Sequence, residues 1–208
     1  MKLRLTNHQK AGAFTLIEMI GVLAVIAILA ALLIPRVFNA INEARVNGTC
    51  ISANTVKTAV ADHYGKYGKF DYLFGTNQIT PMPITNYDTA ILMPEGLLDK
   101  PFSSKLAGGD PQLYSHIELL LGSAAGPSGK GYYLDGSTTN NAVANSPYVV
   151  QVHLQNVAAQ DAKDLNDQLD GVALGPGNVT SADYQGRVEY NAPANGFVSD
   201  LYIYLTSR

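Results

Sequence analysis

The sequence has 208 residues, a mass of 22.2 kDa and a formal net charge of −3. This length accommodates one domain, or one domain and a membrane anchor. The negative charge, and the lack of a basic cluster with interleaved aromatic residues after residue 13, argue against binding to nucleic acid. Cys50 is the only cysteine, which excludes an intramolecular disulfide.

The most distinctive segment is an apolar run from Phe14 to Ile34, in which Glu18 is the only charged residue. As a helix rising about 1.5 Å per residue it would be roughly 31 Å long, enough to span the ~30 Å hydrocarbon core of a bilayer. A basic flank precedes it, comprising Lys2, Arg4 and Lys10. The positive-inside rule therefore predicts a cytoplasmic N-terminus and an exported remainder.

An ordinary secretory signal peptide explains this segment less well. Its apolar core would have about 7 to 15 residues and would be followed by small residues at a cleavage site. Here the apolar run is longer and ends at Pro35 and Arg36, and the small pair Gly12 and Ala13 stands before it. A cut beside that pair would leave the apolar segment in the mature protein. It would also remove three cations and lower the formal charge from −3 to −6.

This combination resembles the type IV pilin-like proteins, which include type IV pilins and the pseudopilins of type II secretion. The resemblance is carried by the short basic leader, the small residues, the sequence FTLIE at residues 14–18, the apolar helix and Pro35. It implies that a prepilin peptidase at the inner membrane cuts between Ala13 and Phe14 and N-methylates the new Phe14 amine. The family usually has glycine immediately before the cut, whereas here Gly12 stands one position earlier.

Glu18 is an acid inside an apolar segment. A carboxylate in the bilayer costs about 2.5 to 3.5 kcal/mol on insertion scales, which makes Glu18 a candidate functional residue. A second interpretation is that Glu18, near the start of the run, reaches lipid headgroups and water. The resemblance implies that Glu18 pairs with the Phe14 amine of a neighbouring subunit and sets the axial register of a filament.

The helix is expected to continue past Pro35 into an amphipathic half. Its predicted apolar stripe comprises Val37, Ile41, Ala44, Ile51, Val56, Ala59 and Val60. Pro35 removes a backbone donor and crowds a carbonyl of the preceding turn, so a kink or a weakened turn is expected there. Glycines within residues 64–68 should cap the helix at a length of roughly 50 residues.

Residues 69–147 contain many prolines and glycines, which predict irregular structure in short pieces. Within them, residues 113–121 indicate a short helix or strand and residues 131–134 a short strand. From residue 148 an alternating pattern predicts a half-buried strand. Its apolar face comprises Val150, Val152 and Leu154, and its polar face Gln151, His153 and Gln155. Residues 158–170 predict a helix that ends at Gly171, and residues 186–190 and 197–205 predict two further strands.

These elements predict an α+β fold in which the amphipathic half of the long N-terminal helix packs on a small antiparallel C-terminal sheet, as in pilin-like proteins. The expected parts are a leader at residues 1–13, a transmembrane and filament-core helix at residues 14–35, and a periplasmic or extracellular globular domain at residues 36–208. The resemblance implies a single-pass inner-membrane protein that later enters a pilus, a pseudopilus or the cell surface.

Side chains that could perform chemistry are few. His63, His116 and His153 are far apart in the sequence and are expected on a helix surface, in local packing and on the solvent face of a strand, respectively. Cys50 is expected to pack as a small apolar side chain. The sequence contains neither a nucleophile elbow nor a phosphate-binding loop, and we expect no enzyme.

An acidic series comprises Asp161, Asp164, Asp167, Asp170 and Asp183. The spacing of three places its first four members along one helical ridge, which is most simply a solvated face. Two functional alternatives are a contact with a neighbouring subunit and a Ca²⁺ site. Some pseudopilins bind calcium in a C-terminal loop, and here Asp170, Asp183 and loop carbonyls would supply the oxygens.

Two classes of function follow. The first is a structural subunit of a type IV pilus or a type II secretion pseudopilus. Its partners are the inner membrane, the prepilin peptidase, identical or related subunits and the assembly platform. The second is a membrane-anchored periplasmic enzyme or binding domain whose leader is never cut. The lack of a recognisable catalytic motif favours the filament subunit.

Overall fold

A computed structural model describes residues 14–73, 78–79, 82–127, 129, 131–136, 146–176 and 178–208. The chain forms two compact units, Met1–Ile41 and Asn42–Arg208. The predicted leader, with Gly12 and Ala13, lies outside the described residues.

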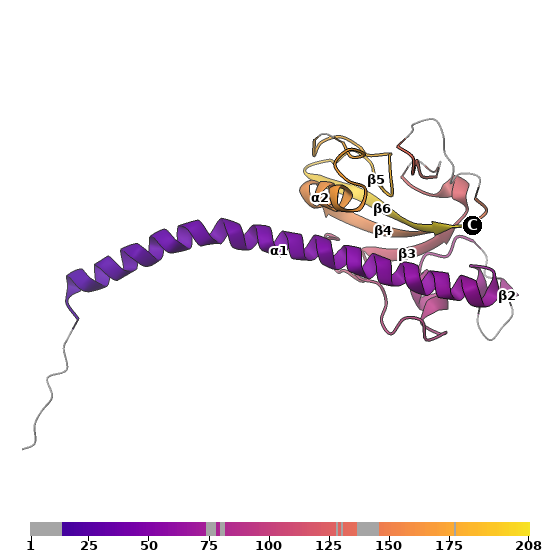
Figure 1. Cartoon of the computed structure of the whole chain (residues 1–208), viewed down its shortest axis with the longest axis horizontal. Helices are drawn as coiled ribbons and strands as arrows, with labels where there is room; N and C mark the ends of the chain where they lie inside the picture. Colours follow the sequence, from indigo (N-terminus) through magenta and orange to yellow (C-terminus); the bar gives the residue numbers. More distant parts are fainter. Residues whose placement is uncertain are drawn as a thin grey trace, which may run out of the picture. The chain divides into compact units, whose positions relative to one another are not determined.

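The first element is the long helix α1, Leu16–Tyr67, which has 52 residues and confirms the predicted length (Figure 1). Pro35 lies inside it. It ends at the predicted glycines: Gly68 has a φ of +67° and donates its N–H to the carbonyl oxygen of Tyr64 at 2.7 Å. Glycine suits this position because a side chain is strained in the left-handed region.

In the first unit, α1 is apolar on all sides from Met19 to Ile34, with Glu18 before this stretch and Arg36 and Asn39 after it. Its large side chains are exposed around the whole circumference, including Ile17, Leu23, Leu29 and Leu33. A helix that is apolar all round is suited to hydrocarbon or to burial among other helices. Within the described residues, α1 is the one helix that is long and apolar enough to span a membrane, and none of its most apolar window is buried.

The second unit contains a four-stranded antiparallel sheet. Its strands, in spatial order, are β3 (Ser115–Leu120), β4 (Val149–Ala158), β6 (Phe197–Ser207) and β5 (Val188–Tyr190). The helix α2, Ala159–Leu169, follows β4 directly. A two-stranded ribbon of β1 (Tyr72–Leu73) and β2 (Gln78–Ile79) follows α1. Short π- and 3₁₀-helical turns occur at η1 (Asp88–Leu92) and η2 (Gly122–Ala124).

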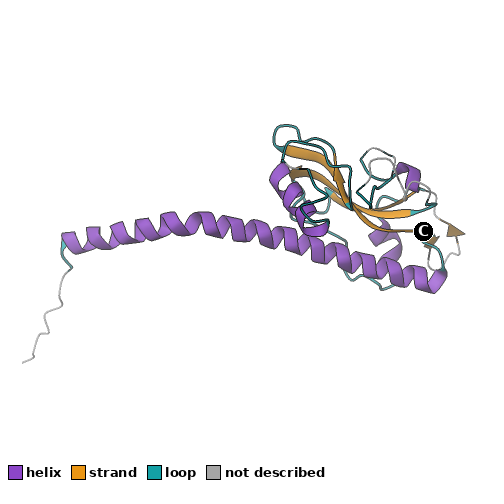
Figure 2. Ribbon diagram, turned by 45° about the horizontal axis from the view of Figure 1, so that its top comes forward, coloured by secondary structure: helices purple, strands orange, loops and turns teal. Residues whose placement is uncertain are grey.

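The sheet and α2 lie beside the C-terminal half of α1, in the view of Figure 1 and in the turned view of Figure 2. The main core joins α1 to one face of the sheet. The helix contributes Val46, Cys50, Ala53, Val56, Ala59 and Val60, and the sheet contributes Ile117, Leu119, Val152, Leu154, Leu201 and Ile203. This arrangement confirms the α+β prediction, and Cys50 packs in the core as expected.

Several predicted elements occur where the sequence places them. Residues 113–121, ambiguous between helix and strand, contain the strand β3. The predicted helix at residues 158–170 is α2, and the two C-terminal strands are β5 and β6. Residues 131–134, however, form no strand. Tyr132 is fully buried there because it packs on the sheet, with its ring centroid 5.3 Å from that of Tyr204.

The strand predicted from residue 148 onwards is β4, but the prediction that its polar face is exposed is wrong. Gln151 is 2% exposed and His153 is 9% exposed. The loop after β3 covers Gln151, whose Oε1 accepts hydrogen bonds from the N–H of Gly126 at 3.0 Å and from the hydroxyl of Tyr132 at 2.9 Å. A polar side chain tolerates burial when its hydrogen bonds are made within the protein.

The predicted apolar stripe of α1 is only partly correct. Val56, Ala59 and Val60 are buried, but Ile41 and Ile51 are 49% and 67% exposed. The buried stripe instead begins at Val46 and includes Thr49, a polar residue that is not among the predicted members. The hydroxyl of Thr49 lies 2.7 Å from that of Ser104, which satisfies it in the core.

His63 ends this buried stripe, so its predicted place on the helix surface is wrong. It is fully buried, and its Nδ1 lies 2.9 Å from Oε2 of Glu95, a side chain that is 1% exposed. Its ring also packs against Tyr67 and Tyr87. The contact between His63 and Glu95 therefore joins the end of α1 to the chain that follows η1.

Candidate processing and assembly site

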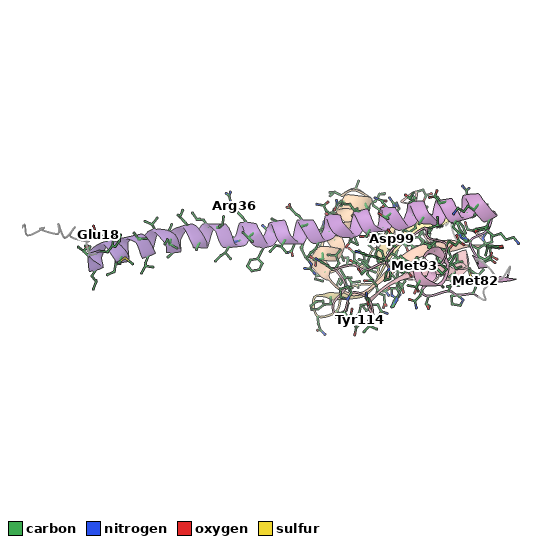
Figure 3. The ribbon with its side chains drawn as sticks, turned by 90° about the horizontal axis from the view of Figure 1, so that it is seen from below. Glu18, Arg36, Met82, Met93, Asp99 and Tyr114 are labelled. Atoms are coloured by element: carbon green, nitrogen blue, oxygen red, sulfur yellow. The ribbon has the colours of Figure 1, made fainter. Side chains whose placement is uncertain are left out.

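The start of α1 is built around Thr15 and Glu18. Oε2 of Glu18 accepts hydrogen bonds from the N–H of Thr15 at 2.8 Å and from its hydroxyl at 2.7 Å. The N–H of Glu18 in turn donates to the hydroxyl oxygen of Thr15 at 3.4 Å. This reciprocal arrangement is a capping box, which satisfies backbone donors that a helix start leaves unpaired. Figure 3 shows Glu18 at this end of α1, with Arg36 farther along the helix.

The capping box gives Glu18 a structural role that the sequence analysis missed, although the spacing Thr-x-x-Glu before an apolar run is its usual signature. Within its own chain, the carboxylate is held at the N-terminus of the helix, where the dipole also favours negative charge. Phe14, directly before the cap, is 81% exposed. The geometry therefore presents Phe14 and a fixed carboxylate together at the tip of an apolar helix.

A family model described as the prokaryotic N-terminal methylation motif matches residues 8–34. This chain carries the signature of type IV pilins and pseudopilins. The matched range contains the predicted cut, Phe14 and Glu18. Comparison with curated proteins and with solved structures gives no match.

The motif supports a precursor similar to the type IV pilins and pseudopilins. It implies processing by a prepilin peptidase and assembly of the pilin type, and it points to a structural subunit rather than an enzyme. With the apolar start of α1, it fits an inner-membrane-anchored protein.

His153 belongs to a charged network on the outer face of the sheet, so its predicted place on a solvent face is wrong. Its Nδ1 lies 3.0 Å from Oε1 of Glu118, and its Nε2 lies 2.8 Å from Oδ1 of Asp200. Burial opposes the charge on the imidazole, but the hydrogen bonds and charges of these two acids outweigh it and raise the pKa of His153. The ring also stacks on Tyr202 with centroids 4.5 Å apart.

The same network borders a cavity of about 310 Å³, whose lining is mostly apolar and includes Glu118, Gln151 and Tyr202. Both oxygens of Glu118 already accept hydrogen bonds, from His153 and from the amide of Gln151. His116, predicted to be in local packing, is partly exposed, and its Nδ1 lies 3.2 Å from Oδ1 of Asn86. The contacts of Glu118, Gln151, His153 and Asp200 join β3, β4 and β6. Both carboxylate oxygens of Glu118 are used in these contacts.

The acidic series is not the uniformly solvated ridge that its spacing suggested. Asp161 is 5% exposed, and its Oδ2 lies 3.5 Å from Nη1 of Arg45. Asp170 accepts the backbone N–H groups of Arg187 and Val188 on Oδ2, at 2.7 and 2.8 Å. Two of these acids therefore hold α2 to α1 and to the start of β5.

Asp183 and Glu189 are buried near this end of the sheet. Burial raises the pKa of Asp183 to about 7, against a hydrogen bond from the N–H of Gln185. Burial likewise raises the pKa of Glu189 to about 8, against a hydrogen bond from the N–H of Tyr133, and the charges of Asp183 and Asp170 raise it further. Both side chains therefore take up protons more readily in the folded chain than when exposed.

We predict that the free energy of unfolding falls as pH rises from about 5 to 9. The folded chain keeps protons that the unfolded chain releases, so the stabilisation is complete below the ordinary carboxyl pKa and is lost as pH passes about 7 and 8. Urea unfolding of the detergent-solubilised chain at several pH values measures this slope.

The variant Glu189→Gln keeps the shape of the protonated acid and removes its titration. It should reduce the slope by up to about 1.4 kcal/mol per pH unit near its steepest point. Asp62→Asn, at an exposed acid of α1, is the control and should leave the slope unchanged. Equal slopes for wild type and Glu189→Gln would contradict the assignment.

Proposed function

We propose that the protein is a structural subunit of a type IV pilus or a type II secretion pseudopilus. The observation that carries the proposal is the methylation motif at residues 8–34, whose larger part forms the exposed apolar start of α1. In this proposal residues 1–13 are a cytoplasmic leader, residues 14–35 are the membrane and filament-core helix, and residues 36–208 form the exported globular domain.

The membrane anchor is temporary in this proposal. A prepilin peptidase cuts between Ala13 and Phe14 and methylates the Phe14 amine, and an assembly platform then extracts the subunit into a filament. The apolar side chains of α1 leave hydrocarbon and are buried again against neighbouring helices. The free-energy change is small because both environments exclude water from the same surface.

Glu18 is proposed to pair with the Phe14 amine of a neighbouring subunit. The exposure of Phe14 and the position of Glu18 at the helix tip support this pairing. An acid among apolar helices requires such a partner, since an unpaired charge is costly there. The capping box holds the carboxylate in place before the partner arrives.

Processing can be tested by mass spectrometry of the protein purified from its native host. We expect the mature chain to begin at Phe14 with a methylated amine, and an Ala13→Asp variant to accumulate as the intact precursor because a charged residue replaces the small one at the cut. An intact Met1 on the wild-type chain would refute the processing step.

The assembly role of Glu18 can be separated from its capping role by three variants. Glu18→Gln retains a capping box but loses the charge, whereas Glu18→Ala loses both. Thr15→Ala weakens the cap by about 1 kcal/mol and keeps the charge. We expect both Glu18 variants to be inserted and processed but to yield at least tenfold fewer filaments, and Thr15→Ala to assemble.

Filaments are counted by shearing and electron microscopy, with processing checked by mass. If Glu18→Gln assembles normally and Thr15→Ala does not, Glu18 acts through its cap and the pairing is wrong.

A calcium site at Asp170 and Asp183 remains a separate proposal. Among the described residues, Oδ2 of Asp183 is buried without a hydrogen-bond partner, which suits a cation, whereas Oδ2 of Asp170 is already occupied by two backbone donors. No group of three or more His, Cys, Asp and Glu side chains placed to hold a metal occurs in the described part of the chain. Loop carbonyls would therefore have to supply most of the remaining ligands.

Calcium titration followed by thermal melting tests this site. If the site forms, Ca²⁺ should raise the melting temperature of the wild-type chain at pH 8, and Asp183→Asn should abolish the increase. Mg²⁺ is the control, since it demands a tighter octahedral site. A melting curve that calcium leaves unchanged would exclude the metal.

A further inference from the structure

Two grooves lie along the same stretch of α1 in the second unit, and their charges are opposite. The first, which we call the acidic groove, has a volume of about 500 Å³ and is lined by Glu43, Val46, Asn47, Asp164, Asp167 and Gln168. The second, the basic groove, has a volume of about 220 Å³ and lies between α1 and residues 103–105. Its charged lining residues are Arg45 and Lys105, and hydroxyl groups of serine and threonine make up much of the rest.

The two grooves open on roughly opposite sides of α1. At about 100° per residue, Arg45 and Ser52 of the basic groove lie roughly 140 to 180° around the helix from Glu43 and Asn47 of the acidic groove. The buried stripe that begins at Val46 runs between the two sides. The two grooves of a single chain therefore cannot contact each other.

The acidic groove keeps negative charge that its own chain leaves uncompensated. Asp167 pairs with Lys163, and among the described residues Asp164 accepts a hydrogen bond only from the neutral amide of Gln160. Glu43 is exposed and has no hydrogen-bond or ion-pair partner among the described residues. The groove is thus an open surface with an excess of negative charge.

The arginine of the basic groove is bonded within its own chain. Nε and Nη2 of Arg45 donate to the carbonyl oxygen of Lys105 at 3.1 and 2.6 Å, and its Nη1 faces Asp161. The backbone of Lys105 is therefore fixed, while its side chain is exposed and its ammonium has no partner within the described part of the chain. Gly48 leaves the groove unfilled, since a Cβ there would meet no atom within 4 Å.

We propose that the acidic groove of one subunit docks against the basic groove of the next, with Glu43 of one copy facing Lys105 of its neighbour. This inference rests on the proposed filament function, for which it names a contact between globular domains. A contact between two different patches of one chain is heterologous, and repeated without closure it produces a helical filament. Opposed charges at such a contact set its register and its specificity more than its affinity.

Charge reversal in the full-length chain, expressed in the native host, tests the contact. Lys105→Glu places like charges opposite Glu43, and Glu43→Lys places like charges opposite Lys105. Each single variant should lower filament yield about tenfold, and the double variant should restore it because the charges are exchanged but still opposed. Lys69→Glu and Asp62→Lys make the same charge changes at exposed residues that line neither groove, and they should assemble normally.

A pair of cysteines tests the same contact without reversing the charge of either groove. The double variant Glu43→Cys with Lys105→Cys should give a ladder of disulfide-linked dimers, trimers and longer chains in oxidised filaments. Either single variant alone should give no ladder, because its cysteines never face each other. Cys50 is buried and does not compete.

The outcomes separate this inference from the filament proposal. If wild-type subunits form filaments and the reversed single variants do so equally well, or if the double variant fails to recover, the groove contact is wrong and the filament function stands. If the charge-reversal variants have a lower melting temperature than the wild type, their filament yields do not test the contact. The disulfide ladder then provides the test, and its absence overturns the contact. If the wild-type chain is processed but forms no filament, the proposed function fails and the contact fails with it.

Discussion

The packing of residues 46–63 of α1 against the inner face of the sheet is the contact on which the globular unit depends. It unites the core, because the apolar side chains of β3, β4 and β6 that face α1 would otherwise be exposed to water. Thr49 and His63 interrupt this stripe with polar groups, and the Thr49 hydroxyl and Nδ1 of His63 each pair with a side chain from a distant loop. Those two pairs tie the irregular chain after α1 to the helix, so the connection is held by the same surface that forms the core.

The same helix meets a different environment in its first half. There the large apolar side chains are exposed on every side, and the helix start has backbone N–H groups that need partners. Thr15 and Glu18 provide for them through the capping box, which places a carboxylate beside Phe14. The exposed apolar surface and the surface that packs in the core lie on separate stretches of α1. One helix can therefore serve both environments.

On the outer face of the sheet, buried polar side chains are hydrogen-bonded by groups from a covering loop and from neighbouring strands. Gln151 accepts donors from the loop that covers it, and His153 lies between two acids from neighbouring strands. Alternation along β4 correctly identified the strand and its apolar face. It could not reveal the loop that buries the other face, because the contacts of Gly126 and Tyr132 with Gln151 depend on the fold.

The sequence alone determined the long helix, its glycine cap, most of the strands, the α+β class and the methylation motif, because each follows from local periodicity or from a fixed spacing of residues. It also contained the Thr15 and Glu18 capping signature, which was not recognised. Only the tertiary structure decided that His63 is buried beside Glu95, that Asp161 faces Arg45, and that grooves of opposite charge flank α1. Those features join residues far apart in the chain, and a one-dimensional pattern holds no information on which distant partner satisfies a polar group.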